Sequence, residues 1–117
     1  MEMNALQYQN KLSGLAKALA VARSVHPDMS VLQLRVLIHI AGQGQVSGTE
    51  VATSLDLHKA VVSRIIGVLS DVRVSGRQAE GLGFVAINED PLNRRVRLAS
   101  ITDKGHGFIQ QLVECLE

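Results

Sequence analysis

Apolar residues recur at three- and four-residue steps in the first part of the chain, which is the spacing of one face of an α-helix. Over residues 2–25 this face carries Leu12, Leu15, Leu19 and Ala22. Pro27 ends the helix, because proline disfavours helical geometry in the residue before it and has no backbone donor. The pattern predicts an amphipathic helix over residues 2–25.

A second helix is predicted between a capping serine and a pair of glycines. The Ser30 side chain can cap its start, it runs through Gly42, and Gly44 follows its end. The helix is apolar on most sides, so we expect these residues to be largely buried: Leu34, Val36, Leu37, Ile38 and Ile40.

Two more helices follow, separated by a tight turn. The first opens at Ser47 or Thr49 and ends at Leu55, and the second runs from about His58 to at least Leu69. The inward face of the second helix carries Val62, Ile65, Ile66 and Leu69. The pattern predicts a helix-turn-helix unit.

Two β-prone runs come next and are predicted to pair as a hairpin across the turn-prone stretch 88–93. The first run contains Phe84, Val85 and Ile87, and the second contains Val96, Leu98 and Ile101. Thr102 and Asp103 then offer N-cap chemistry to a last helix. Its apolar face carries Phe108, Ile109, Leu112, Val113 and Leu116.

The composition supports one folded domain and excludes several classes of protein. The chain has 117 residues, of which 46% are hydrophobic, 20% charged and only 3% aromatic, so we expect an aliphatic, helix-rich core. Cys115 is the single cysteine, and we expect it to be a buried or interfacial apolar residue rather than a redox sensor. The sequence shows no ligand spacing typical of a zinc site and no set of residues typical of a catalytic triad. No segment resembles a secretion signal or a membrane span. We therefore expect a cytoplasmic protein that is not an enzyme and holds no metal or cofactor.

The charge is unevenly distributed along the chain. The formal net charge is only +1. Residues 57–97 hold seven basic and four acidic residues, which gives +3, whereas residues 102–117 carry −2. The positive charge therefore lies in the helix-turn-helix and hairpin regions.

The run from Val51 to Ile65 closely resembles the helix-turn-helix signature of bacterial regulators. Ala52 is small where the helices cross, Leu57 fills the turn, and Asp56 stands where glycine is usual and tolerates left-handed geometry. The outward face of the second helix carries His58, Lys59, Ala60, Val61, Ser63 and Arg64. The resemblance implies that this face enters the major groove of duplex DNA. We expect His58 to act as an N-cap or phosphate contact rather than as a pH switch.

Residues 90–105 resemble the wing of the MarR family of transcriptional regulators, whose pattern is D-x-x-D-x-R, a strand, and L-T-x-x-G. The matching residues are Asp90, Arg95, Thr102 and Gly105, with Asn93 in place of the second acid and Ile101 in place of leucine. We expect Asp90 to pair with an arginine and, with Asn93, to shape the wing. Arg94 or Arg95 at its tip would enter the minor groove or hold a phosphate.

The resemblance covers roughly residues 30–105 and predicts a winged helix-turn-helix fold, mainly α with a small β-hairpin wing (α+β). We expect a single domain over 1–117, with a dimerisation helix at 1–25, a winged helix core at 30–101 and a C-terminal helix at 102–117. Residues 70–80 form an insertion relative to the family. Relative to the family pattern we expect this chain to lack the usual last long helix, so the helices at both ends are expected to supply the dimer contacts.

The function implied by the resemblance is sequence-specific binding of double-stranded DNA by a homodimeric transcriptional regulator, a repressor acting on a pseudo-palindromic operator. The alternative is a winged helix module for protein–protein interaction with weak or no DNA binding, which the modest net charge favours. The sequence does not identify a small-molecule effector.

Overall fold

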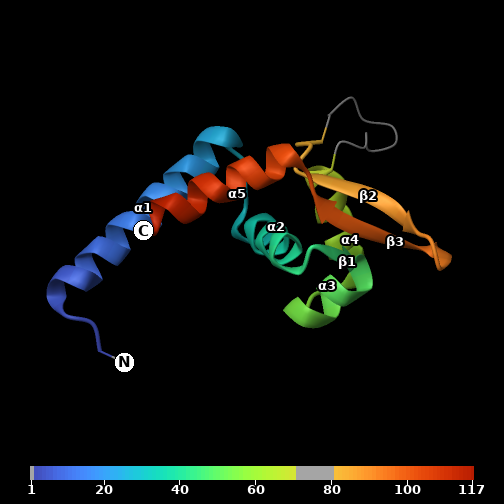
Figure 1. Ribbon diagram of the computed structural model, residues 1–117, viewed down its shortest axis with the longest axis horizontal. Helices are drawn as coiled ribbons and strands as arrows, with labels where there is room; N and C mark the ends of the chain where they lie inside the picture. Colours follow the sequence, from blue (N-terminus) through green and yellow to red (C-terminus); the bar gives the residue numbers. More distant parts are fainter. Residues whose placement is uncertain (1, 71–80) are drawn as a thin grey trace. The chain divides into compact units, whose positions relative to one another are not determined.

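The computed structural model describes residues 2–70 and 81–117 (Figure 1). Its contacts divide the chain into two compact units, one formed by Ser30–His106 and the other by Met1–Met29 together with Gly107–Glu117. The expected insertion at 70–80 lies outside the described residues, apart from Ser70.

The elements follow the predicted order, with one additional strand. They are α1 (Ala5–Val25), α2 (Val31–Gln43), β1 (Gln45–Ser47), α3 (Gly48–Leu55), α4 (Lys59–Leu69), β2 (Val85–Asp90), β3 (Asn93–Ile101) and α5 (Asp103–Cys115). In the described part of the chain, no helix is both long and apolar enough to cross a membrane.

Polar side chains set where the helices begin. The Asn4 side chain accepts a hydrogen bond from the backbone N–H of Gln7 at 2.8 Å, and the Gln7 side chain accepts one from the Asn4 N–H at 3.2 Å. Because this reciprocal cap sits at residue 4, α1 starts at Ala5 rather than at the expected residue 2. Ser30 caps α2 in the same way, as predicted, and Ser47 caps α3.

The core of the Ser30–His106 unit is aliphatic, as the composition predicts. Val36, Leu37 and Ile40 of α2 are fully buried, and α4 contributes Val62, Ile65, Ile66 and Leu69. The expectation for Ile38 was wrong, because 53% of its surface is exposed. At about 100° per residue, position 38 lies on the opposite side of the helix from the buried residues.

The sheet has three antiparallel strands in the order β1-β3-β2. The strand β1 was not predicted, because three residues are too few to show an alternating pattern; Val46 of β1 is paired with Ala99 of β3. The expected turn at 88–93 is also shorter than predicted. Residues 88–90 remain in β2, with Asn88 opposite Leu98, so cross-strand pairing outweighs their low β propensity.

The chain on either side of residues 71–80 is held together at the C-terminal end of α4. Gly81 lies so close to the Ser70 carbonyl that a Cβ atom there would collide with it. Three backbone hydrogen bonds join the two sides: Leu82 N–H to Val68 O at 2.9 Å, Gly83 N–H to Ser70 O at 3.3 Å, and Phe84 N–H to Leu69 O at 2.8 Å. These bonds position the start of β2 relative to α4, whatever the length of the segment between them.

Thr102 joins the sheet to α5. Its hydroxyl donates to the Gly83 carbonyl at 2.7 Å and accepts from the Gly105 N–H at 3.0 Å, which caps the helix as predicted. Gly105 is buried against the Phe84 carbonyl, where a Cβ atom would not fit. This explains in physical terms why the T-x-x-G pattern is found at the end of the wing.

Candidate nucleic-acid interface

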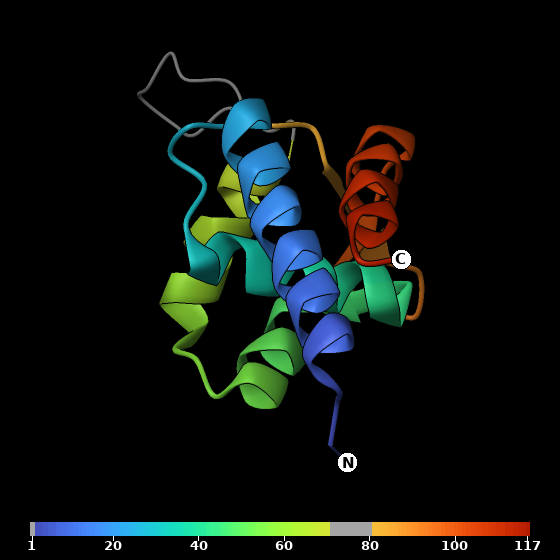
Figure 2. The same cartoon turned by 90° about the vertical axis from the view of Figure 1, so that its left-hand side faces the viewer.

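The turn of the helix-turn-helix has the predicted left-handed residue. Asp56 has φ 54° and ψ 53°, and it is the only non-glycine residue with a positive φ among those described. The backbone N–H of Leu57 donates to the Ala52 carbonyl at 2.8 Å, which closes the end of α3. Figure 2 shows α3 in green and the turn that leads from it into α4. The predicted role of Asp56 is confirmed, and Leu57 is half-buried beside it.

Packing sets the orientation of α4. Val62 and Leu69 are fully buried, and Ile65 and Ile66 are each 7% exposed, as the sequence predicted. At the start of α3, a Cβ atom at Gly48 would lie 3.8 Å from the Ile66 side chain, which is ordinary van der Waals contact, so α3 packs beside α4 here without a need for glycine. The opposite face of α4 is therefore presented to solvent.

All six residues predicted for that outward face are exposed: His58, Lys59, Ala60, Val61, Ser63 and Arg64. His58 occupies the N-cap position, but its side chain makes no capping hydrogen bond. From Leu57 to Leu69 the chain has two basic residues and no acidic residue. The exposed N-terminal part of α4 is thus positive, and the helix dipole adds to this charge.

The wing tip is shaped by two local hydrogen bonds from side chains to the backbone. The Asp90 carboxylate accepts from the Leu92 N–H at 2.9 Å, and the Asn93 side-chain oxygen accepts from the Arg95 N–H at 3.2 Å. The expected ion pair between Asp90 and an arginine is not seen among the described residues, where the carboxylate holds the Leu92 N–H instead. Both positions need an acceptor oxygen rather than a negative charge, so asparagine can replace the second acid.

The arginines of the wing point into solvent. Arg94, Arg95 and Arg97 are all exposed on β3. Side chains two residues apart on a strand share a face, so Arg95 and Arg97 lie on one side of the wing. Arg97 was not among the predicted site residues, although this two-residue spacing from Arg95 could have identified it.

A groove of about 930 Å³ separates α4 from the wing, and all its residues belong to the Ser30–His106 unit. On the helical side it is lined by Lys59, Ser63 and Gly67, and on the wing side by Glu89, Arg95 and Arg97. Thr49 at the start of α3 also lines it and was missed by the sequence reasoning. Of the predicted site residues, Lys59, Ser63 and Arg95 thus border one groove, whereas Arg64 and Arg94 do not line it.

The other unit has an exposed row of apolar residues on α1. Leu12, Leu15 and Leu19 are 48%, 52% and 57% exposed, whereas Ala22 is buried. The predicted stripe is present, but only one end of it is covered within this unit. Val113 of α5 and Leu116, which directly follows that helix, are also exposed, at 49% and 45%.

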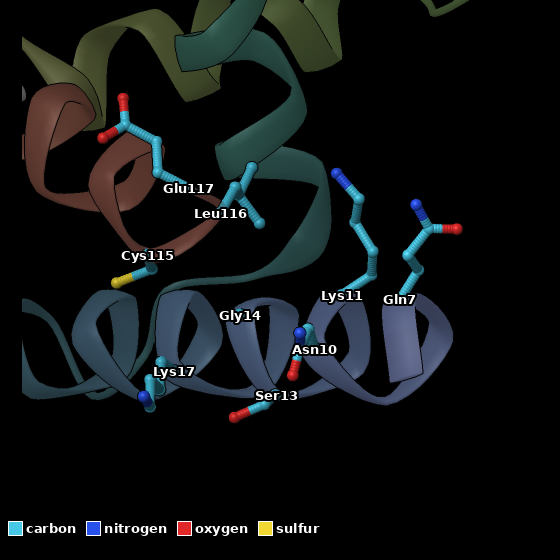
Figure 3. A pocket seen from close by; sticks show the side chains of 9 residues that line it. All are labelled: Gln7, Asn10, Lys11, Ser13, Gly14, Lys17, Cys115, Leu116 and Glu117. Atoms are coloured by element: carbon cyan, nitrogen blue, oxygen red, sulfur yellow. The ribbon is translucent and has the colours of Figure 1, made fainter. Parts of the chain in front are cut away.

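The end of α5 crosses α1 at Gly14. A Cβ atom at Gly14 would lie against the carbonyl of Cys115 and 3.3 Å from the Cα of Leu116. Figure 3 shows the hollow beside this crossing, where Lys11 and Gln7 point to the side of α5 and Ser13 points away from it. Cys115 is half-buried at the crossing, as expected for an apolar packing role.

No protein-family model matches the sequence, and no curated protein matches it. Similar folds are nevertheless found among solved structures. A transcriptional regulator from Thermotoga maritima has a TM-score of 0.67 and 22% identity, with 95% of this chain and 67% of that chain covered. Wild-type apo MarR from E. coli has a TM-score of 0.66 and 16% identity, with 99% and 77% covered.

A third similar structure is BpsR from Bordetella bronchiseptica, whose DNA binding is described as regulated by 6-hydroxynicotinic acid. Its TM-score is 0.58 and its identity 21%, with 97% of this chain and 74% of that chain covered. The helix-turn-helix and the three-stranded antiparallel sheet thus match the fold of these regulators. The chain has a MarR-like winged helix-turn-helix fold.

Proposed function

We propose that this protein is a transcriptional regulator that binds specific sequences in double-stranded DNA as a homodimer. One observation carries the proposal: Lys59 and Ser63 of the exposed face of α4 line the same groove as Arg95 and Arg97 of the wing, within one compact unit. The major and minor grooves of duplex DNA can be engaged together by such a helix and wing. The likeness in fold to regulators, including one with regulated DNA binding, supports the same conclusion.

In the proposed complex, α4 reads the major groove. Lys59 and Arg64 neutralise phosphates or donate to guanine, and Ser63 bonds a phosphate or a base edge. Ala60 and Val61 contact thymine methyl groups, since both are small, apolar and exposed. His58 begins the helix and adds a phosphate contact.

The wing reads the minor groove. Arg94 and Arg95 follow directly after the two-residue turn that the Asp90 and Asn93 side chains hold in shape. A narrow minor groove has a strongly negative potential that attracts arginine. The wing would therefore add a preference for DNA shape to the base contacts of α4.

Dimerisation would use the helices at the two ends of the chain. The exposed leucines of α1, and Val113 and Leu116 near the end of the chain, form apolar surfaces that a second copy can cover. A two-fold dimer places half-sites about 10 bp apart, so the operator would be a pseudo-palindrome. Repression would follow from occlusion of the promoter. In this proposal the chain is one winged helix domain that works in the cytoplasm, without catalysis.

The test is selection of binding sites from a randomised duplex pool, followed by anisotropy titrations at several salt concentrations. Arg64→Ala and Arg95→Ala should each lower the affinity for the selected site about tenfold or more and make the salt dependence less steep. The matched control is Arg35→Ala, which removes an exposed arginine of α2 that lies outside both α4 and the wing. A palindrome that is enriched and lost with both test variants supports the proposal.

A protein-interaction module remains the second candidate, because the net charge is only +1. In that case no sequence would be enriched, and any DNA binding would be equally insensitive to Arg64→Ala, Arg95→Ala and Arg35→Ala. A steep salt dependence would contradict this second candidate, since it reports several phosphate contacts.

A further inference from the structure

The tip of the wing displays an apolar side chain that the proposed arginine contacts do not use. Leu92 is 95% exposed, more than any other large hydrophobic residue among those described. It lies between Pro91 and Asn93 in the two-residue turn that joins β2 to β3. A single exposed leucine is ordinary on a protein surface, so its meaning depends on how it is held and on what surrounds it.

The backbone around Leu92 is constrained on both sides. Pro91 limits its own φ to near −65°, and the Leu92 N–H is bonded to the Asp90 carboxylate at 2.9 Å. On the far side, the Asn93 side chain holds the Arg95 N–H at 3.2 Å. The side chain of Leu92 is thus carried at a fixed place on the wing, and little backbone entropy would be lost if it were inserted into a partner.

The charges around Leu92 favour a polyanion as that partner. Arg94 and Arg95 follow it closely in sequence, and both are exposed. The nearest acid, Asp90, is half-buried and its carboxylate accepts the Leu92 N–H. An apolar tip followed by two arginines fits the minor groove, where cations contact the flanking phosphates and an aliphatic side chain can enter between base pairs.

We propose that Leu92 is a wedge that partly inserts at a base step in the minor groove and kinks the operator at each wing. This inference rests on the proposed DNA binding and adds a determinant of specificity to it. Pyrimidine–purine steps, TA and CA/TG, unstack most easily. We therefore expect the operator to contain such a step under each wing, at a position where the protein makes no hydrogen bond to a base.

The experiment places 2-aminopurine at the wing-proximal steps of the selected operator and measures its fluorescence, with end-to-end energy transfer to report bending. Wild-type protein should raise the 2-aminopurine signal and shorten the end-to-end distance. Leu92→Ala should bind about tenfold more weakly and lose both changes, whereas Leu92→Met should keep them. Replacing the flexible step by a stiff A-tract step should lower the operator affinity of the wild type more than that of Leu92→Ala.

The outcomes separate the wedge from the proposed function. If wild type and Leu92→Ala bind the operator with the same fluorescence and the same bend, the wedge is wrong and the DNA-binding regulator stands. If the wild type binds no duplex DNA, both fail. Because the Leu92 side chain is almost fully exposed, Leu92→Ala should unfold at the same temperature as the wild type, which excludes a folding defect as the cause.

Discussion

Asp56 shows how a single backbone angle constrains residue choice in this protein. Its φ of 54° lies in the left-handed region, which costs most L-residues about 1–2 kcal/mol and which aspartate tolerates better than a β-branched residue does. This unfavourable conformation is required because the turn must end α3 and begin α4 within three residues.

Substitutions at Asp56 should therefore divide by conformation rather than by charge. We expect Asp56→Val to lower the free energy of unfolding by about 1–2 kcal/mol, and Asp56→Gly to leave it unchanged or raise it slightly. Urea denaturation of the two variants measures the difference. Equal losses for valine and glycine would show instead that the carboxylate itself is what matters.

The side-chain oxygens of Asp90 and Asn93, which accept backbone hydrogen bonds at the wing tip, give a second prediction at the residue scale. Asp90→Asn keeps an acceptor oxygen for the Leu92 N–H, whereas Asp90→Ala removes it. In the proposed complex, we expect Asp90→Asn to bind DNA at least as tightly as the wild type, because it also removes a negative charge. We expect Asp90→Ala to bind several-fold more weakly, since the tip loses its fixed shape.

Anisotropy titration against the selected operator distinguishes these variants, with Asn93→Asp as the control that restores the acid of the family pattern. If Asp90→Asn were as impaired as Asp90→Ala, an ion pair formed on binding DNA would explain the residue better than the hydrogen bond does.

At the scale of elements, two glycines lie in helices for different reasons. Gly67 in α4 has nothing within 4 Å of the place where a Cβ atom would stand, whereas Gly14 in α1 lies against the backbone of Cys115 and Leu116. Glycine inside a helix costs about 0.5–1 kcal/mol relative to alanine. Of these two glycines, only Gly14 has the packing of another element to offset this cost.

Alanine at the two positions should thus have opposite effects. We expect Gly67→Ala to raise the free energy of unfolding by about 0.5–1 kcal/mol and Gly14→Ala to lower it by about 1–3 kcal/mol. Thermal unfolding of both variants tests this. A stabilised Gly14→Ala would mean that the crossing of α1 and α5 is not close in solution.

At the scale of the whole molecule, the exposed leucines of α1 give the sharpest prediction about assembly. We expect Leu15→Lys to shift the protein from dimer to monomer in light scattering, because a charge would be buried in the proposed apolar interface. The monomer should bind a full operator with about half the salt slope of the dimer.

The control for this prediction is Ala20→Lys, which adds the same charge at an exposed position about 100° around the helix from Leu19. This variant should remain a dimer. If both variants or neither became monomeric, the leucine row would not be the dimer interface.

Sequence patterns alone predict the order of the helices, the capping serines, the left-handed position at Asp56 and the two faces of α4. These features depend on residues within a few positions of one another, which is why local patterns predict them. The resemblance of residues 90–105 to a wing was equally local and pointed to the correct fold.

Features that depend on segments far apart in the chain could be found only in the three-dimensional structure. The strand β1 exists because Val46 pairs with Ala99, far along the chain, and β2 extends through residues 88–90 because β3 lies beside it. The exposure of Ile38 and of the α1 leucines, and the groove that joins α4 to Arg97, likewise depend on which elements pack together. Periodicity shows that a face is apolar, but the free energy of burial depends on the neighbour that covers it.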